Sequence, residues 1–143
     1  MENRRIARAI EKHFDAVKHK RIDEILELYA ESDELLVFVE GPRWQTLGYA
    51  NVEKGWRDFV NSEIVVRECV WAENLRTRTV GKMGFVAGIA RLEVEIKGEM
   101  KTIEFRGTFV LEENAEGSWK IIHEHFSQPA ENPYGIGDWL KKE

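Results

Sequence analysis

The apolar residues of this chain change their spacing once, near Ile64. Before that point they recur every three or four residues, which places them on one face of a helix. After that point they tend to alternate with polar residues, which is the period of a strand. Helices first and strands afterwards predict an α+β domain in which the helices pack on one face of a mostly antiparallel sheet.

Three helical stretches and one short strand are predicted before the change. The apolar face of the first helix is made by Ile6, Ala9, Ile10, His13, Phe14 and Val17. A second apolar repeat covers residues 22–29, and a third follows Gly48. The compact apolar run 35–39, followed by Gly41 and Pro42, is typical of a strand that enters a turn.

The second half predicts four long strands joined by hairpin-like turns. They cover residues 64–78, 83–96, 100–112 and 118–127. A chain of 143 residues with no internal repeat and no linker fits one domain, which we place at 1–129. The segment 130–143 is expected to be an irregular tail, with one helical turn at 138–142.

Charge and hydropathy argue against several kinds of partner. The 21 basic and 26 acidic residues are scattered along the chain, so no basic stripe indicates a nucleic acid. No apolar run is long enough to span a membrane, and the polar N-terminus lacks the core of a signal peptide. We therefore expect a cytoplasmic protein that binds neither nucleic acid nor membrane.

Several predicted strands carry apolar side chains at successive positions, as at 64–66 and 85–87. In a sheet with one solvent-exposed face, apolar and polar residues would alternate along each strand. We therefore expect the helices to cover one face and a second subunit to cover the other, which gives a homodimer through the sheet. The alternative is that these runs only reflect the strand propensity of β-branched residues.

The last predicted strand carries two histidines, His123 and His125. Strict alternation places both on one face with Trp119, Ile121 and Ser127, with the two histidines about 7 Å apart at their Cα atoms. Two such imidazoles fit a proton-transfer pair, two ligands of a metal ion, or structural and ligand-positioning groups. A metal site needs further ligands, and no partner motif stands out, so we predict no metal.

Three more polar residues lie in apolar surroundings. His13 shares the apolar face of the first helix, where it is either a satisfied core residue or a catalyst. Arg91 and Arg106 lie in neighbouring predicted strands. Each would bind an anionic ligand, or pair at the rim with Glu93, Glu95 or Glu104.

Aromatic residues gather around the predicted turn and third helix, where the sequence has Trp44, Gln45, Tyr49 and Trp56. Together with Phe14 they predict either the walls of a small-molecule pocket or ordinary core packing. Glu40, the acid beside the turn, is a candidate general base. Cys69 has no activating partner in the sequence and is expected to be a small buried hydrophobe.

The common cofactor and hydrolase motifs are absent from the sequence. It contains no phosphate-binding glycine loop, no dinucleotide fingerprint, no serine nucleophile elbow and no HExxH. We therefore predict no cofactor.

The order of elements and the segment 117–129 resemble the nuclear transport factor 2-like, or cystatin-like cone, superfamily. That segment reads Gly-Ser-Trp-Lys-Ile-Ile-His-Glu-His-Phe-Ser-Gln-Pro and looks like the ending of the SnoaL-like group. It is also similar to the association domain of calcium/calmodulin-dependent kinase II, which ends in a Gly-x-Trp…His-x-His-x-Ser pattern. The resemblance covers about residues 4–129 and implies a strongly bent sheet, a conical pocket beneath three helices and a dimer through the sheet.

The resemblance also implies roles for single residues. Arg91 matches an arginine that projects into the pocket of the kinase domains, which accepts small carboxylates, whereas Arg106 matches less well. Steroid isomerases of this fold have a tyrosine donor at the position of His13 and a general base at that of Gly41, beside Glu40. Their second donor is an aspartic acid, which would fall at the non-acidic positions 108 or 109, so we do not expect their mechanism here.

We therefore predict a dimeric SnoaL-like protein that binds a small carboxylate or hydroxylated molecule. The predicted ligand-binding residues are Arg91, Arg106, Trp44, Trp56, His123 and Phe14, and the catalytic candidates are His13, His125 and Glu40. The alternatives are an isomerase, dehydratase or cyclase that uses histidine acid–base chemistry, and an oligomerisation module.

Overall fold

The computed structural model describes residues 1–39 and 41–136. Its helices are α1 Glu2–Lys18, α2 Ile22–Glu27 and α3 Tyr49–Val60. Its strands are β1 Leu36–Phe38, β2 Thr46–Leu47, β3 Val65–Val80, β4 Met83–Ile96, β5 Glu99–Glu113 and β6 Trp119–Ser127. The predicted helices and strands are confirmed, and the short β2 is an addition. The predicted turn at 138–142 lies outside the described residues.

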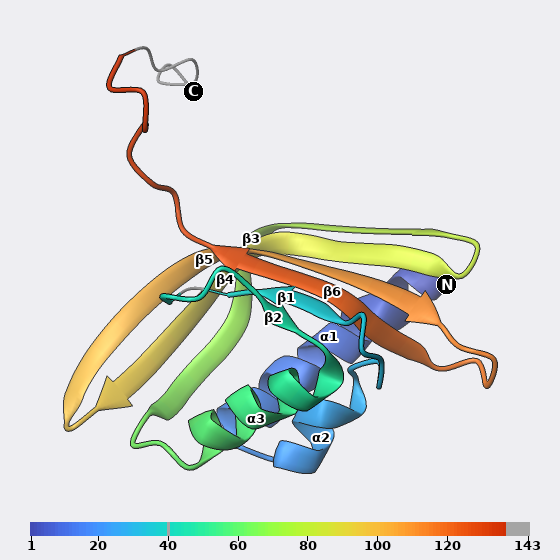
Figure 1. Ribbon diagram of the computed structural model, residues 1–143, viewed down its shortest axis with the longest axis horizontal. Coiled ribbons are helices and arrows are strands. Elements are labelled where there is room, and N and C mark those ends of the chain that lie inside the picture. The colour runs from blue at the N-terminus through green and yellow to red at the C-terminus, as the bar shows by residue number, and fades with distance from the viewer. Residues whose placement is uncertain (40, 137–143) are drawn as a thin grey trace.

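The strands form one sheet in the order β2-β1-β6-β5-β4-β3. All neighbouring strands are antiparallel except β1 and β6, which are parallel. The sheet curves over the three helices, which all lie on the same side of it (Figure 1). The predicted α+β fold with helices on one face of a bent sheet is therefore confirmed.

The helix α1 lies along β3 and β4 and supplies much of the core. Its buried side chains are Ile6, Ile10, His13, Phe14, Ala16 and Val17. They share one apolar cluster with inward-facing residues of the sheet, which include Val86, Ala90, Val94, Phe109 and Leu111. Burying one large apolar side chain contributes roughly 1.5–3 kcal/mol, so this contact holds the helices on the sheet.

On the inner face of the sheet, a glycine in β5 leaves room for an aromatic ring of β6. Gly107 pairs with Phe126 of β6, and a Cβ atom on Gly107 would lie 2.8 Å from the Cζ atom of Phe126. The Phe126 ring is also in contact with Phe105 and Phe109, at centroid distances of 6.1 Å and 5.3 Å. Because its neighbours hold the ring, a larger residue at Gly107 would strain the core.

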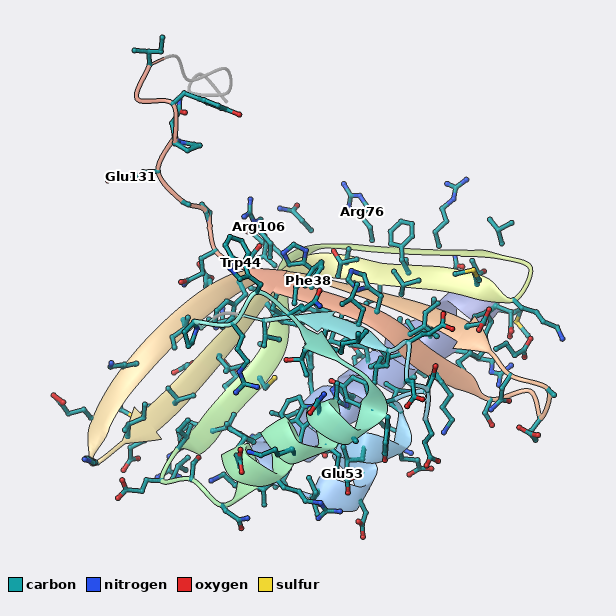
Figure 2. The ribbon with its side chains drawn as sticks, viewed as in Figure 1. Phe38, Trp44, Glu53, Arg76, Arg106 and Glu131 are labelled. Atoms are coloured by element: carbon teal, nitrogen blue, oxygen red, sulfur yellow. The ribbon has the colours of Figure 1, made fainter. Side chains whose placement is uncertain are left out.

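None of the helices α1, α2 and α3 lies over the outer face of the sheet (Figure 1). Phe38, Arg76 and Arg106 project from this side (Figure 2). Three apolar side chains of β3 and β4 stay exposed there: Val80 at 77%, Met83 at 44% and Phe85 at 38%. This is the face on which the sequence predicts a second subunit.

No helix within the described residues is long and apolar enough to cross a membrane. The cytoplasmic location stays a prediction.

Replacing Gly107 with alanine should destabilise the fold by roughly 1–3 kcal/mol, because the new methyl group overpacks against Phe126. Gly55 provides a matched control, since it lies inside α3 and a Cβ atom there meets open space. Gly55→Ala should stabilise the protein by roughly 0.5–1 kcal/mol through helix propensity. Urea denaturation of both variants measures these changes, and an unchanged midpoint for Gly107→Ala would contradict the packing described here.

Candidate functional site

The site begins at Tyr29, which follows the short helix α2. The backbone around it is hydrogen-bonded to β6: the Ala30 amide donates to the Ile121 carbonyl at 2.9 Å, and the Ile121 amide donates to the Leu28 carbonyl at 2.7 Å. These two bonds fix the chain on both sides of Tyr29. Its side chain is 1% exposed and lies inside the core.

Glu124 of β6 faces the same interior because β6 contains a bulge. Val110 of β5 pairs with His123, and the next residue, Leu111, pairs with Ile121. Ile122 of β6 is therefore an extra residue that has no partner in β5. The bulge reverses the alternation of side chains that follow it. As a result, Glu124 is 4% exposed and lies on the helix side of the sheet.

Four side chains form a buried polar cluster at this point, which we call the central cluster: His13, Tyr29, Trp56 and Glu124. The Tyr29 hydroxyl donates to Glu124 Oε1 at 2.5 Å, and the Trp56 indole N–H donates to the Tyr29 oxygen at 3.1 Å. Burial, followed by the charge of Glu124, raises the pKa of Tyr29 well above its usual range. The Tyr29 hydroxyl therefore keeps its proton and acts as a donor to the carboxylate.

His13 completes the central cluster from α1. Its Nε2 atom lies 3.5 Å from the Tyr29 oxygen, and its ring meets the edges or faces of Tyr29, Trp56 and Phe109. Burial lowers the pKa of His13 to about 4, and the nearby Ile25 carbonyl offsets only part of that effect. The ring is therefore neutral at pH 7. Its Nδ1 atom is buried and has no hydrogen-bond partner within the described part of the chain.

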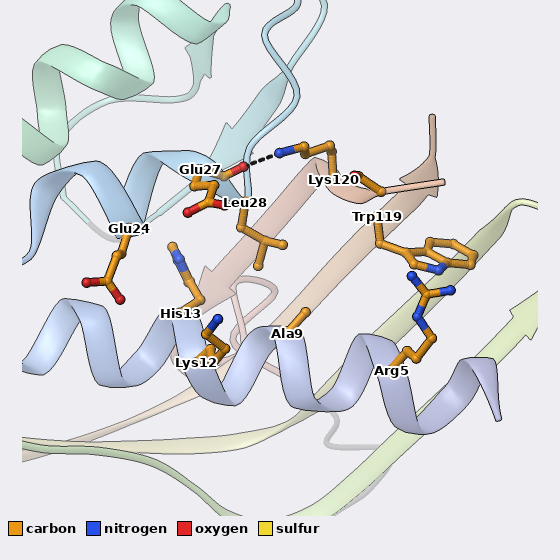
Figure 3. A pocket seen from close by; sticks show the side chains of 10 residues that line it. Arg5, Ala9, Lys12, His13, Glu24, Glu27, Leu28, Trp119 and Lys120 are labelled. Atoms are coloured by element: carbon orange, nitrogen blue, oxygen red, sulfur yellow. Dashed lines mark hydrogen bonds between the residues drawn. The ribbon is translucent and has the colours of Figure 1, made fainter. Parts of the chain in front are cut away.

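A cleft of about 280 Å³ runs along α1 and has His13 in its wall. Figure 3 shows Arg5, Lys12 and His13 on α1. Around them lie Glu24 and Glu27 of α2, Leu28 just after that helix, and Trp119 and Lys120 of β6. Lys120 Nζ donates to the Glu27 carbonyl at 2.5 Å and joins two walls of the cleft. The cleft therefore combines three cationic side chains, two carboxylates and the neutral imidazole.

The two histidines of β6 lie on the opposite face from the one that holds the central cluster. Because of the bulge, Trp119 and Ile121 point into the core, whereas His123 is half-buried and His125 is exposed on the outer face. The two histidines share a face, as expected, but the expectation that Trp119 and Ile121 lie on that same face was wrong. His123 Nδ1 donates to the Leu36 carbonyl at 2.8 Å, and both imidazoles meet the Phe38 ring edge-on at 5.4 Å and 5.3 Å.

The two arginines also lie on the outer face. Arg91 alternates with the buried Ala90, and its Nη2 and Nε atoms donate to Glu68 Oε1 at 3.0 Å and 3.1 Å. Arg106 Nη2 donates to Ser127 Oγ and to the Gln128 carbonyl, both at 3.2 Å. Neither guanidinium group is brought to the central cluster.

The aromatic residues predicted as pocket walls separate into two groups. Phe14 is buried and Trp56 is half-buried next to the central cluster, but Trp44 is 96% exposed in the turn before β2. Glu40 lies outside the described residues. Burial raises the pKa of the Cys69 thiol to about 12, with a smaller effect of Glu124, so the thiol stays protonated.

No group of three or more potential metal ligands occurs among residues 1–39 and 41–136.

Comparison with solved structures identifies the class of fold. The chain is similar to a nuclear transport factor 2-like protein of unknown function from Pseudomonas putida KT2440, with a TM-score of 0.75 and 21% identity over 93% of this chain and 90% of that one. A putative calcium/calmodulin-dependent protein kinase II association domain from Xanthomonas campestris gives 0.75 and 21% over 90% and 89%. A ketosteroid isomerase-like protein from Erwinia carotovora gives 0.67 and 16% over 90% and 98%. The fold is that of the nuclear transport factor 2-like superfamily.

The family model of the SnoaL-like domain matches residues 6–131. The chain belongs to the SnoaL-like domain family. No curated protein matches the sequence.

The buried His13 predicts a pH dependence of stability. An unfolded histidine titrates near pH 6.5, whereas folded His13 titrates near 4, so the unfolded state binds more protons between these values. The folded state should therefore lose about 3 kcal/mol from this residue as pH falls from 6.5 to 4.

Denaturation of wild type and His13→Phe across this pH range measures the effect. Phenylalanine keeps a ring in place but does not titrate, so the variant should lose this part of the slope. His19→Gln, at an exposed residue, should retain it. Parallel curves for wild type and His13→Phe would show that His13 is not buried in its neutral form.

Proposed function

We propose that this SnoaL-like protein binds a small organic molecule that carries a hydroxyl or carboxylate group, in the cleft beside His13. The observation that carries the proposal is the buried Nδ1 atom of His13, which has no hydrogen-bond partner among the described residues and belongs to a residue in the cleft wall. A buried polar atom without a partner costs free energy, and a ligand can recover it. A nitrogen of a neutral imidazole either donates or accepts a hydrogen bond, and a hydroxyl group can be its partner in both cases.

The charges around the cleft support a carboxylate on the same ligand. Arg5, Lys12 and Lys120 supply three cations, but Arg5 is in ion pairs with Glu2 and Glu113. Lys12 makes no ion pair or hydrogen bond within the described ranges, and it is adjacent to His13 in α1. A molecule that places its hydroxyl near His13 could therefore place a carboxylate near Lys12.

A second candidate function is acid–base catalysis on the bound molecule. The low pKa of His13, caused by burial, leaves an unprotonated imidazole that can accept a proton at neutral pH. The Tyr29–Glu124 pair lies beside it and fixes one side of the ring. This arrangement favours an isomerase, dehydratase or cyclase that uses His13 over one that uses His125, which is exposed on the outer face.

We also propose that the protein is a homodimer through the outer face of its sheet. On β4 the outward residues Phe85, Ala87 and Ile89 follow one another across this face, and Val110 of β5 lies opposite Phe85. Phe85 is 38% exposed, although aromatic residues are usually buried. A second copy would remove this apolar strip from water.

A panel of small hydroxy acids and carboxylates should contain molecules that raise the melting temperature. A ligand at 100 times its Kd adds about 2.7 kcal/mol, which corresponds to a shift of several degrees. His13→Phe should remove the shift because it lacks the polar nitrogen, whereas His19→Gln should keep it. If every hit also shifts His13→Phe, the ligand does not bind beside His13.

The same hits distinguish binding from catalysis. Each is incubated with the protein and followed by proton NMR for loss of substrate. Turnover that falls by roughly 10²–10⁴-fold in His13→Phe supports acid–base catalysis. Binding without turnover would support ligand binding and contradict catalysis on these molecules.

Light scattering should give a mass of about twice 16.7 kDa for the wild type. Phe85→Glu places a charge in the proposed interface and should give the mass of one chain. Met100→Glu is the control, because Met100 is 55% exposed near the β4–β5 hairpin rather than in the centre of the face. A wild-type mass of one chain would exclude the dimer.

A further inference from the structure

On the outer face of the sheet, the row of residues through Ile89 carries opposite charges at its two ends. Ile89 of β4 pairs with Glu73 of β3 on one side and with Arg106 of β5 on the other. Residues that pair directly across neighbouring strands project to the same face of a sheet. Arg106 projects outward (Figure 2), so the acid and the base lie on the outer face, on either side of one apolar residue.

The two charges of this row are not neutralised within the subunit. Among the described residues, neither Glu73 nor Arg106 takes part in an ion pair, and both are exposed. Arg106 donates to the Ser127 hydroxyl at 3.2 Å, on the side of β5 that is away from β3. By contrast, Arg91 on the same face is already paired with Glu68 at 3.0 Å. Glu73 and Arg106 are therefore the charges of this region that remain available to a partner.

The apolar strip of β4 runs between these two charges. Its outward residues Phe85, Ala87 and Ile89 follow one another at every second position. A two-fold axis parallel to β4 would place this strip against its own copy, because residues next to the axis of a symmetric dimer meet themselves. The same axis would bring β3 of one subunit over β5 of the other, since these two strands flank β4 on opposite sides.

We propose that the homodimer, on which this inference rests, has its two-fold axis along β4 and contains two ion pairs between Glu73 and Arg106 of the partner subunit. The two pairs are equivalent by symmetry, so each subunit supplies one acid and one base. In the next row Arg76 would lie opposite Thr108 of the partner subunit, whose hydroxyl can accept a hydrogen bond. The apolar strip supplies the buried surface, and the charges fix the orientation of the two copies.

The charges select this axis over one that crosses the strands. An axis perpendicular to β4 would place each strand over its own copy. Glu73 of β3 would then lie over the partner's β3, and Arg106 of β5 would lie over the partner's β5. The two unpaired charges would not meet, and both would stay without a counter-charge in the interface.

Two charge reversals test this arrangement. Glu73→Arg would bring two cations together at each contact, and Arg106→Glu would bring two carboxylates together. Each variant alone should raise the Kd of the dimer by roughly 10- to 100-fold, measured by sedimentation equilibrium. An equimolar mixture of the two variants should associate again, because each contact then joins a cation and a carboxylate. Glu53→Arg, on α3 at the helix side of the sheet (Figure 2), is the control and should keep the wild-type Kd.

The mixture separates a contact between subunits from one within a subunit, because each variant chain carries two like charges and cannot form an internal pair. Glu73→Gln and Arg106→Gln only remove a charge, so they test the contact even where a reversed chain does not fold. Each should raise the Kd about two- to tenfold. A mixture that stays monomeric, or single reversals that keep the wild-type Kd, would overturn this arrangement while the wild-type dimer stands. A wild-type mass of one chain would instead exclude the dimer itself.

Discussion

The hydrogen bond from Tyr29 to Glu124 is the interaction on which the interior of this protein depends. A carboxylate on the inner face of a sheet is costly to bury unless strong hydrogen bonds compensate it. The tyrosine that supplies this bond lies just after α2, and the indole that donates to the same oxygen lies on α3. The imidazole beside them lies on α1. One acid on β6 is therefore linked through Tyr29 to a side chain of α1, to a side chain of α3 and to the segment that follows α2.

The same interaction explains the position of the unsatisfied nitrogen of His13. The hydroxyl of Tyr29 donates a hydrogen bond to Glu124 and accepts one from Trp56. It lies next to only one nitrogen of the imidazole, Nε2. The other side of the ring faces away from the cluster, toward α2 and the cleft. Within the described residues, the buried side-chain atoms without a hydrogen-bond partner are His13 Nδ1 and Trp71 Nε1, and His13 also belongs to the wall of the cleft.

Much of the fold follows from the spacing of apolar residues, but the site follows from it only in part. The helical period identified α1 and placed His13 on its buried face, which the structure confirms. Alternation along the last strand gave the wrong face for His123 and His125, because a bulge at Ile122 is a property of pairing between two strands. For the same reason Glu124 could not be recognised as an interior residue. Tyr29 was identified as an apolar-face residue, while its role as a donor depends on a partner 95 positions away.

The extra residue in β6 also matters for comparing this chain with its relatives. A protein of the same fold that lacked it would present the equivalents of His123 and His125 to the interior and that of Glu124 to solvent. Two such proteins would align without a gap over most of their length and still differ in which residues of this strand reach the central cluster. Roles transferred by alignment through residues 117–129 would then be displaced by one position, so a family signature in this segment identifies ancestry more reliably than it identifies chemistry.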